Sequence, residues 1–239
     1  MIEDSNEYLV GIVLGIRFNP NFSVRDNLGA IADEILYGKD TIFGPNVFQK
    51  VMSTENFQQI LVSEETNDQF RINNLDFILE INFKDNPNFS IENIDHVIQK
   101  FHSQIINGVM DKFFIKNIRR VGYVKKFLID QEDIAEKLIS KTISNIENGI
   151  SDCNISFSKK IPLSESLTKK ELNDYDNVNY SFIKKPDLKE LNINFDFQSH
   201  FEPPLPKSNN IKFPQFIQKS NDYFNKHFIP LVNEKILGE

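Results

Sequence analysis

The sequence predicts an α+β fold, with a ferredoxin-like βαββαβ half at residues 1–129 and an αβββα half at residues 130–239 that packs on the same sheet or extends it. Some segments alternate apolar and polar residues, as half-buried strands do, and others repeat apolar residues every three or four positions, as helices do. In the first half these segments follow the order strand, helix, hairpin, helix, strand. The chain has 239 residues, 40% of them hydrophobic, which is enough to form a core.

The first strand is expected at residues 8–18, YLVGIVLGIRF. Apart from its glycines and Arg17, the segment is apolar at both odd and even positions, which is typical of a central strand covered on both faces. Gly11 and Gly15 suggest that a helix packs closely across this strand.

The first helix is predicted to begin at the S-x-x-D motif of residues 23–26 and to end before Gly38. The following segment, 39–56, is expected to be a loop. Two further strands are expected at residues 57–63 and 69–83, where the polar sequence EETND between them indicates a hairpin. In the second of these strands, apolar residues alternate with acidic and amide residues, which predicts one buried face and one wet face.

A long helix is expected to begin at Ser90, because apolar residues recur at helical spacing as far as Phe113. A strand at residues 115–129 follows it directly and closes the βαββαβ order. In the second half we expect a helix at 130–149, strands at 154–163, 176–184 and 188–199, and a final helix at 213–236 that is kinked at Pro230.

The strand at residues 115–129, IKNIRRVGYVKKFLI, contains five cations in a chain that is acidic overall. Alternate residues of a strand point to opposite faces, and neither set is purely apolar here, so one or more cations must face a partly buried environment. An edge or wet strand, internal ion pairs, and contact with a ligand or nucleic acid all fit this pattern. The candidate binding residues on it are Arg119, Arg120, Tyr123, Lys125 and Lys126.

Motifs for metal binding, nucleotide binding or catalysis are missing from the sequence. The four histidines match no zinc spacing, and no GxGxxG, GxxxxGK[ST], GxSxG or HExxH occurs. We therefore expect no metal, no cofactor and no catalytic residue of these kinds. Aspartates near the predicted element ends could still meet in space to hold magnesium or to share a proton, and the sequence does not indicate which would do so.

The net charge is −7 with a pI near 5.2, so the field of the whole molecule does not favour binding to nucleic acid or anionic lipid. Cys153 is the only cysteine, which fits a reducing cytoplasm. The N-terminus is acidic where a secretory signal would be basic, and the apolar run after it ends at Arg17, too early to span a bilayer. We expect a cytoplasmic protein with no membrane contact.

Two segments carry a resemblance to a known family. VGIVLGIRF at 10–18 and RRVGYVKKF at 119–127, together with a closing helix after an alternating strand, resemble an uncharacterised family of sporadically distributed bacterial proteins of about 250 residues with a central RIGLRY-N-like strand. Residues 123–126 depart from the L-R-Y-x-N pattern of that family and lack its asparagine. The resemblance implies a sensor, adaptor or partner subunit, such as a component of an anti-phage defence assembly.

From these observations we expect a non-enzymatic binding, adaptor or sensor protein that acts through contacts with another protein or with a second copy of itself. The alternative is a nucleic-acid-binding or RNA-processing protein, which the cationic strand would serve. An enzyme that uses buried carboxylates is a third class, because such a site leaves no local signature in a sequence.

Overall fold

The computed structural model describes residues 8–38, 47–54, 58–84, 91–129, 153–162, 174–184 and 190–234. The strands are β1 (Leu9–Phe18), β2 (Lys50–Thr54), β3 (Gln58–Val62), β4 (Gln69–Ile72), β5 (Asp76–Asn82), β6 (Ile118–Ile129), β7 (Cys153–Pro162), β8 (Tyr175–Lys184) and β9 (Leu191–Leu205). The helical segments are α1 (Phe22–Asp26), α2 (Leu28–Tyr37), α3 (Ile91–Lys100), the π-helical η1 (Phe101–Val109), α4 (Met110–Lys112), the 3-10 turn η3 (Ser208–Asn210), α6 (Phe213–Tyr223), the π-helical η4 (Phe224–Phe228) and α7 (Ile229–Val232).

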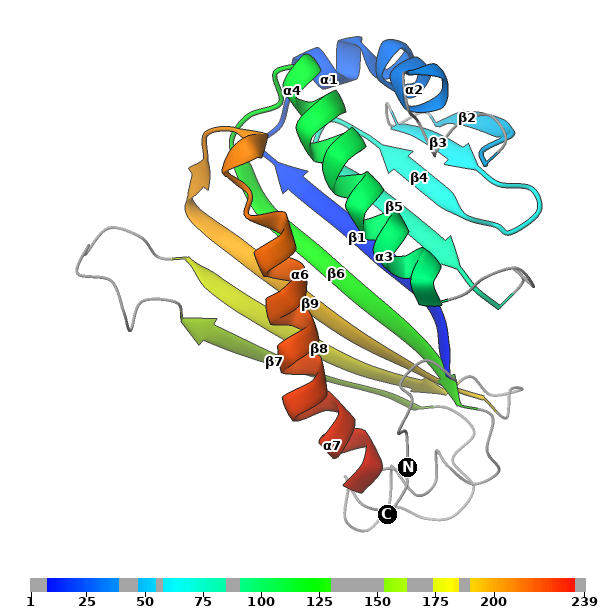
Figure 1. Ribbon diagram of the computed structural model, residues 1–239, viewed down its shortest axis with the longest axis vertical. Helices are drawn as coiled ribbons and strands as arrows, with labels where there is room; N and C mark the ends of the chain where they lie inside the picture. Colours follow the sequence, from blue (N-terminus) through cyan, green and yellow to red (C-terminus); the bar gives the residue numbers. More distant parts are fainter. Residues whose placement is uncertain are drawn as a thin grey trace.

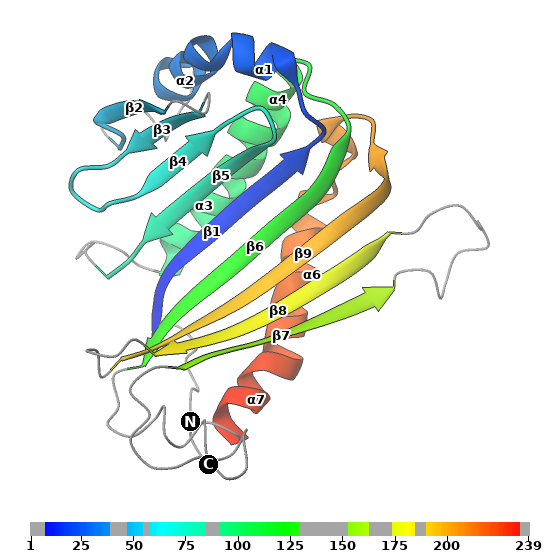
Figure 2. The same ribbon diagram turned by 180° about the vertical axis from the view of Figure 1, so that it is seen from behind.

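All the described strands belong to one antiparallel sheet in the order β2-β3-β4-β5-β1-β6-β9-β8-β7 (Figure 1). Two long helical rods, α3–η1–α4 and α6–η4–α7, cross the same face of this sheet. Figure 2 shows the opposite face, over which no described helix lies. We call this opposite face the uncovered face.

The predicted ferredoxin-like βαββαβ arrangement is wrong, because the described strands form one nine-stranded antiparallel sheet. Two features separate the observed sheet from the expected one. β2, which was not expected, pairs outside β3, the strand predicted at 57–63, and β9 pairs with β6 along almost its whole length, so that β6 is not the edge of a smaller sheet. The buried residues of β9 continue the buried row of β6, since Phe197 pairs with Tyr123 and Ile193 with Phe127. The hydrophobic surface of β6 is therefore extended sideways by further strands.

The strand predicted at 115–129 is confirmed as β6, but it is an interior strand between β1 and β9 and not an edge. The segment predicted as a loop at 39–56 contains β2 in its described part. The strand predicted at 69–83 is two strands, β4 and β5, separated by a turn.

Asn73 explains why the chain turns between β4 and β5. Its side-chain Oδ1 accepts hydrogen bonds from the backbone N–H groups of Leu75 at 2.8 Å and Asp76 at 2.9 Å. These side-chain hydrogen bonds close a local turn in place of the hydrogen bonds between neighbouring strands. As a result, Leu75 is 38% exposed, and Asp76, which alternation assigns to a wet face, is only 6% exposed.

The core lies between the sheet and the two rods and is built largely of phenylalanine. On one side Phe70 of β4 meets Phe101 of η1, with ring centroids 6.5 Å apart. On the other side Phe195 of β9 packs edge-on against Phe224 of η4 at 5.2 Å. Phe101 also contacts Phe213 of α6 at 5.7 Å, so the aromatic packing is continuous beneath both rods.

The final predicted helix is interrupted by a change of winding. It passes from α6 into the π-helical segment η4, which ends two residues before Pro230 in the first turn of α7. Proline has no N–H to donate, and a π-helical turn is one way for a helix to accommodate that loss. The helix predicted at 130–149 lies outside the described residues. No helix in the described ranges is both long and apolar enough to cross a membrane.

Candidate binding site on the uncovered face

Side chains on the uncovered face line up in rows across the central strands, because neighbouring strands in a sheet place paired residues on the same face. One row runs from β5 to β8 through Asp76, Arg17, Arg120, His200 and Tyr175. The next row runs through Ile78, Gly15, Gly122, Gln198 and Asn177.

The second row produces a hollow in this face. Gly15 of β1 and Gly122 of β6 are direct partners, and neither has a side chain to fill the space above the sheet. A groove of about 160 Å³ lies over them. Its lining residues are Val13, Gly15, Ile16, Arg17, Asp76, Ile78, Arg120, Gly122, Val124, Asp196 and Gln198. Gly15 thus opens a groove on the uncovered face, and the helix that we expected to pack against it is on the other side.

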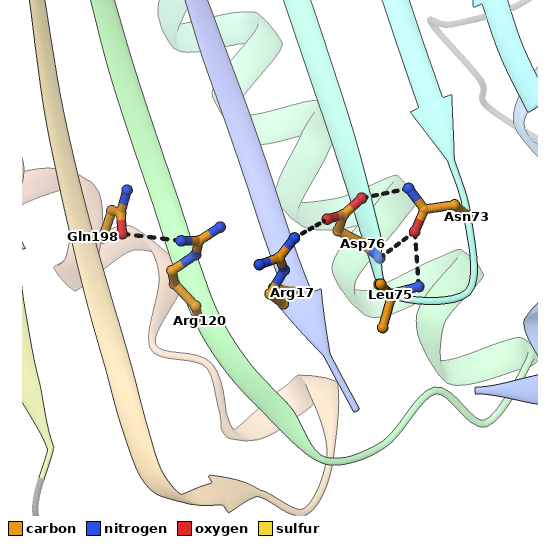
Figure 3. Close-up of polar contacts among 6 residues, drawn as sticks. All are labelled: Arg17, Asn73, Leu75, Asp76, Arg120 and Gln198. Carbon is orange, nitrogen blue, oxygen red and sulfur yellow. Dashed lines mark hydrogen bonds and ion pairs between the residues drawn. The ribbon is translucent and has the colours of Figure 1, made fainter. Parts of the chain in front are cut away.

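Arg17 is held at one wall of this groove by Asp76 on the neighbouring strand (Figure 3). Its Nη2 donates to Oδ2 of Asp76 at 3.0 Å. The other oxygen of that carboxylate accepts from the Asn73 amide at 2.6 Å. The turn that separates β4 from β5 therefore also fixes the carboxylate that orients Arg17.

Arg120 lies directly opposite Arg17 on β6, so two like charges face each other across the β1–β6 pair. Its Nη1 donates to Oε1 of Gln198 at 3.2 Å. Burial is the main cause that lowers the pKa of the Arg120 guanidinium, and the charge of Arg17 lowers it further. Among the residues that the structure describes, Arg120 forms no ion pair, and its direct partner is a neutral amide. The cation is therefore only weakly compensated.

Gln198 is itself fixed by its neighbours. Its Nε2 donates to Oδ2 of Asp196 at 2.5 Å, which leaves Oε1 as the acceptor for both Arg120 and His200. The contact of 3.1 Å between Oε1 and Nε2 of His200 then requires a proton on that nitrogen. Burial raises the pKa of Asp196, although its hydrogen bonds from Asn179 and Gln198 act in the opposite direction. The network holds the guanidinium of Arg120 in one orientation.

A second polar network lies on the same face, nearer the C-terminal end of β6. Lys126 of β6 donates to Oε1 of Glu80 at 2.5 Å, and Arg71 of β4 contacts the other oxygen of that carboxylate at 3.4 Å. The contact crosses β1 diagonally, since Lys126 is opposite Gly11 of β1 and Glu80 is opposite Val13. Lys126 therefore forms an internal ion pair on the uncovered face.

The five candidate residues on β6 do not form one surface. Arg120 and Lys126 point to the uncovered face, whereas Tyr123 is 1% exposed and lies in the core. Lys125 lies on the helix-covered side, with its Nζ 4.1 Å from the ring centroid of Phe224. Arg119 is exposed at the start of the strand, where its Nε donates to the side chain of Asn19.

Burial lowers the pKa of Lys125 to about 8, with a smaller opposing effect from Asp95. The same burial raises the pKa of Tyr123 above its usual range. These two groups belong to the packing between the sheet and the helices and not to the groove.

The comparisons with known proteins give no family. No family model matches the sequence, and no curated protein matches it. Within the described ranges, no group of three or more His, Cys, Asp and Glu residues is placed to hold a metal ion.

Proposed function

We propose that the protein is a non-enzymatic binding protein, an adaptor or sensor, that docks a partner protein on its uncovered sheet face. The observation that supports this proposal is the groove over Gly15 and Gly122, which has an apolar floor and two arginines at its wall. Arginine beside a desolvated apolar pocket is a typical anchor of protein interfaces.

The fixed polar networks around the groove support the same proposal. Arg17 and Lys126 are tied to carboxylates of β5, and Arg120 is tied to Gln198. Because these contacts already order the long side chains, a partner would pay little of the entropy normally lost when an interface forms. A pre-ordered surface of this kind favours docking.

Nucleic-acid binding remains the alternative, and the geometry supports it less. Tyr123, the aromatic residue of the cationic strand, is buried. On the uncovered face, Tyr175 stacks on His200 at 4.5 Å and has Nζ of Lys160 3.7 Å from its ring centroid. Its π surface is thus already engaged by two neighbours, whereas binding to single strands depends on open aromatic faces.

The test is to identify a partner by pull-down from the native host, to purify it and to measure its affinity for variants of this chain. Val124→Arg would fill the groove with a side chain that Asp196, its partner on β9, can neutralise. Val51→Arg is the control, because Val51 is 48% exposed on the edge strand β2. We expect Val124→Arg to weaken binding by about tenfold or more and Val51→Arg to leave it unchanged. A partner that binds Val124→Arg as tightly as wild type, or a monomeric protein with no reconstituted partner, would refute the proposal.

A further inference from the structure

We propose that Arg17 and Arg120 together form a binding site for a carboxylate, contributed by an acidic side chain of the partner protein. The inference rests on the proposed function and names the chemistry that the groove recognises. It follows from the donors that the two guanidinium groups leave unused, from the charge around them and from the size of the groove.

Both guanidinium groups have N–H donors that no described contact uses. Among the described contacts, Arg17 donates through Nη2 and Arg120 through Nη1. Figure 3 shows the two guanidinium groups side by side on adjacent strands, with Arg17 turned toward Asp76 and Arg120 toward Gln198. Each group therefore keeps further N–H donors for the space between them, and a guanidinium binds a carboxylate in a planar fork.

Two like charges that face each other across a strand pair destabilise a sheet unless something compensates them. Asp76 compensates Arg17 directly, at 3.0 Å. The hydrogen-bond partner of Arg120 is the neutral amide of Gln198, and Asp196 and Asp76 act on it at longer range. A carboxylate placed between the two guanidinium groups would give Arg120 a charged hydrogen-bond partner, in addition to the longer-range attraction of the aspartates.

The local charge favours a carboxylate over a phosphate. The two arginines and two aspartates at the groove have formal charges that cancel. Asp76 and Asp196 repel any anion in the groove, but they repel a singly charged carboxylate about half as strongly as a phosphate dianion at the same place. The groove of about 160 Å³ has room for one acidic side chain.

The site can be tested without the partner. Acetate, inorganic phosphate and chloride would be titrated at constant ionic strength into isotope-labelled protein while NMR follows the Nε–Hε signals of Arg17 and Arg120. We expect acetate to shift both signals with saturation, and chloride to leave them in place. A matched pair of capped peptides, Gly-Val-Glu-Val-Gly and its glutamine counterpart, then tests the carboxylate within a polypeptide.

Substitutions separate a shaped site from diffuse positive charge. Arg120→Lys keeps the charge but loses the fork, and we expect it to weaken acetate and glutamate-peptide binding by about tenfold. Arg120→Gln should abolish both, whereas Arg119→Gln is the control, because Arg119 lies at the exposed start of β6. The dispersion of the backbone NMR spectrum shows whether each variant is folded.

Equal shifts with acetate and chloride, shifts with phosphate alone, or full affinity in Arg120→Gln would overturn the carboxylate site. These outcomes are distinct from failure of the proposed function. If Val124→Arg abolishes a reconstituted complex while acetate never binds, the docking face stands and the carboxylate site falls. If acetate binds and no partner is found, the carboxylate site stands and the proposed docking function falls.

Discussion

Replacing Lys125 by methionine should stabilise the protein at neutral pH. The ammonium of Lys125 lies beneath the helices, 4.1 Å from the ring centroid of Phe224. Burial lowers its pKa from the ordinary value of 10.5 to about 8. At about 1.4 kcal/mol per pH unit, keeping this group charged in the folded protein costs about 3 kcal/mol.

The pH dependence has a definite sign. Between pH 8 and 10.5 the unfolded chain keeps the Lys125 proton while the folded protein loses it, so the free energy of unfolding rises with pH across this window. Below pH 8 both states are protonated and the full cost is present. Methionine has a similar shape and no charge, so the variant should exceed wild type by about 3 kcal/mol at pH 7 and converge with it near pH 10.5.

The assay is urea unfolding of both proteins at pH 7, 8, 9 and 10, with the difference in unfolding free energy plotted against pH. Taking the difference removes the contribution of other titrating groups. Lys116→Met, at an exposed position before β6, is the control and should show no such trend. A difference that is constant with pH, or a Lys125→Met protein that is less stable than wild type at pH 7, would refute the reasoning.

Three further predictions concern stability and can be checked by the same unfolding assay at pH 7. Phe195→Ala removes a fully buried ring that packs on several others and should cost about 3–5 kcal/mol, whereas Phe157→Ala, at a ring 48% exposed, should cost far less. Gly11→Ala should cost about 1–3 kcal/mol, because its Cβ would lie 2.7 Å from a backbone carbonyl oxygen of β5, whereas Gly15→Ala meets its nearest atoms at 3.9 Å and should be tolerated. Asn73→Ala leaves two backbone N–H groups of the β4–β5 turn without their acceptor and should cost about 1–2 kcal/mol.

Periodicity predicts individual elements of this chain well, because it depends only on which face of each segment is buried. The alternation in β9 and the largely apolar run of β1 both indicate the strands that the structure contains. Periodicity does not say which strands become neighbours. That choice depends on matching the buried rows of distant segments, such as Phe197 of β9 with Tyr123 of β6, and the ferredoxin-like order failed at this step.

The groove could not be predicted from the sequence for the same reason, because it depends on which strands are neighbours. Arg17 is visible in the sequence as a break in an apolar strand, and Gly122 as a glycine in a cationic one. Nothing local indicates that Arg17 faces Arg120 or that Gly15 faces Gly122, because both pairs depend on the register between β1 and β6. A shift of one residue would break up both pairs, for instance by placing Arg17 opposite Val121 and Gly15 opposite Tyr123.

The register also explains why a strand with five cations does not make a basic surface. Consecutive residues of β6 alternate between the covered and uncovered faces, so Lys125 contacts the aromatic core while Lys126 reaches Glu80 two strands away. What distinguishes Arg120 from Lys126 is the partner opposite it, since a neutral amide leaves a cation able to accept another counter-charge whereas a carboxylate does not. Specific recognition on this face should therefore depend on Arg120 far more than on Lys126, although the sequence presents the two as equivalent.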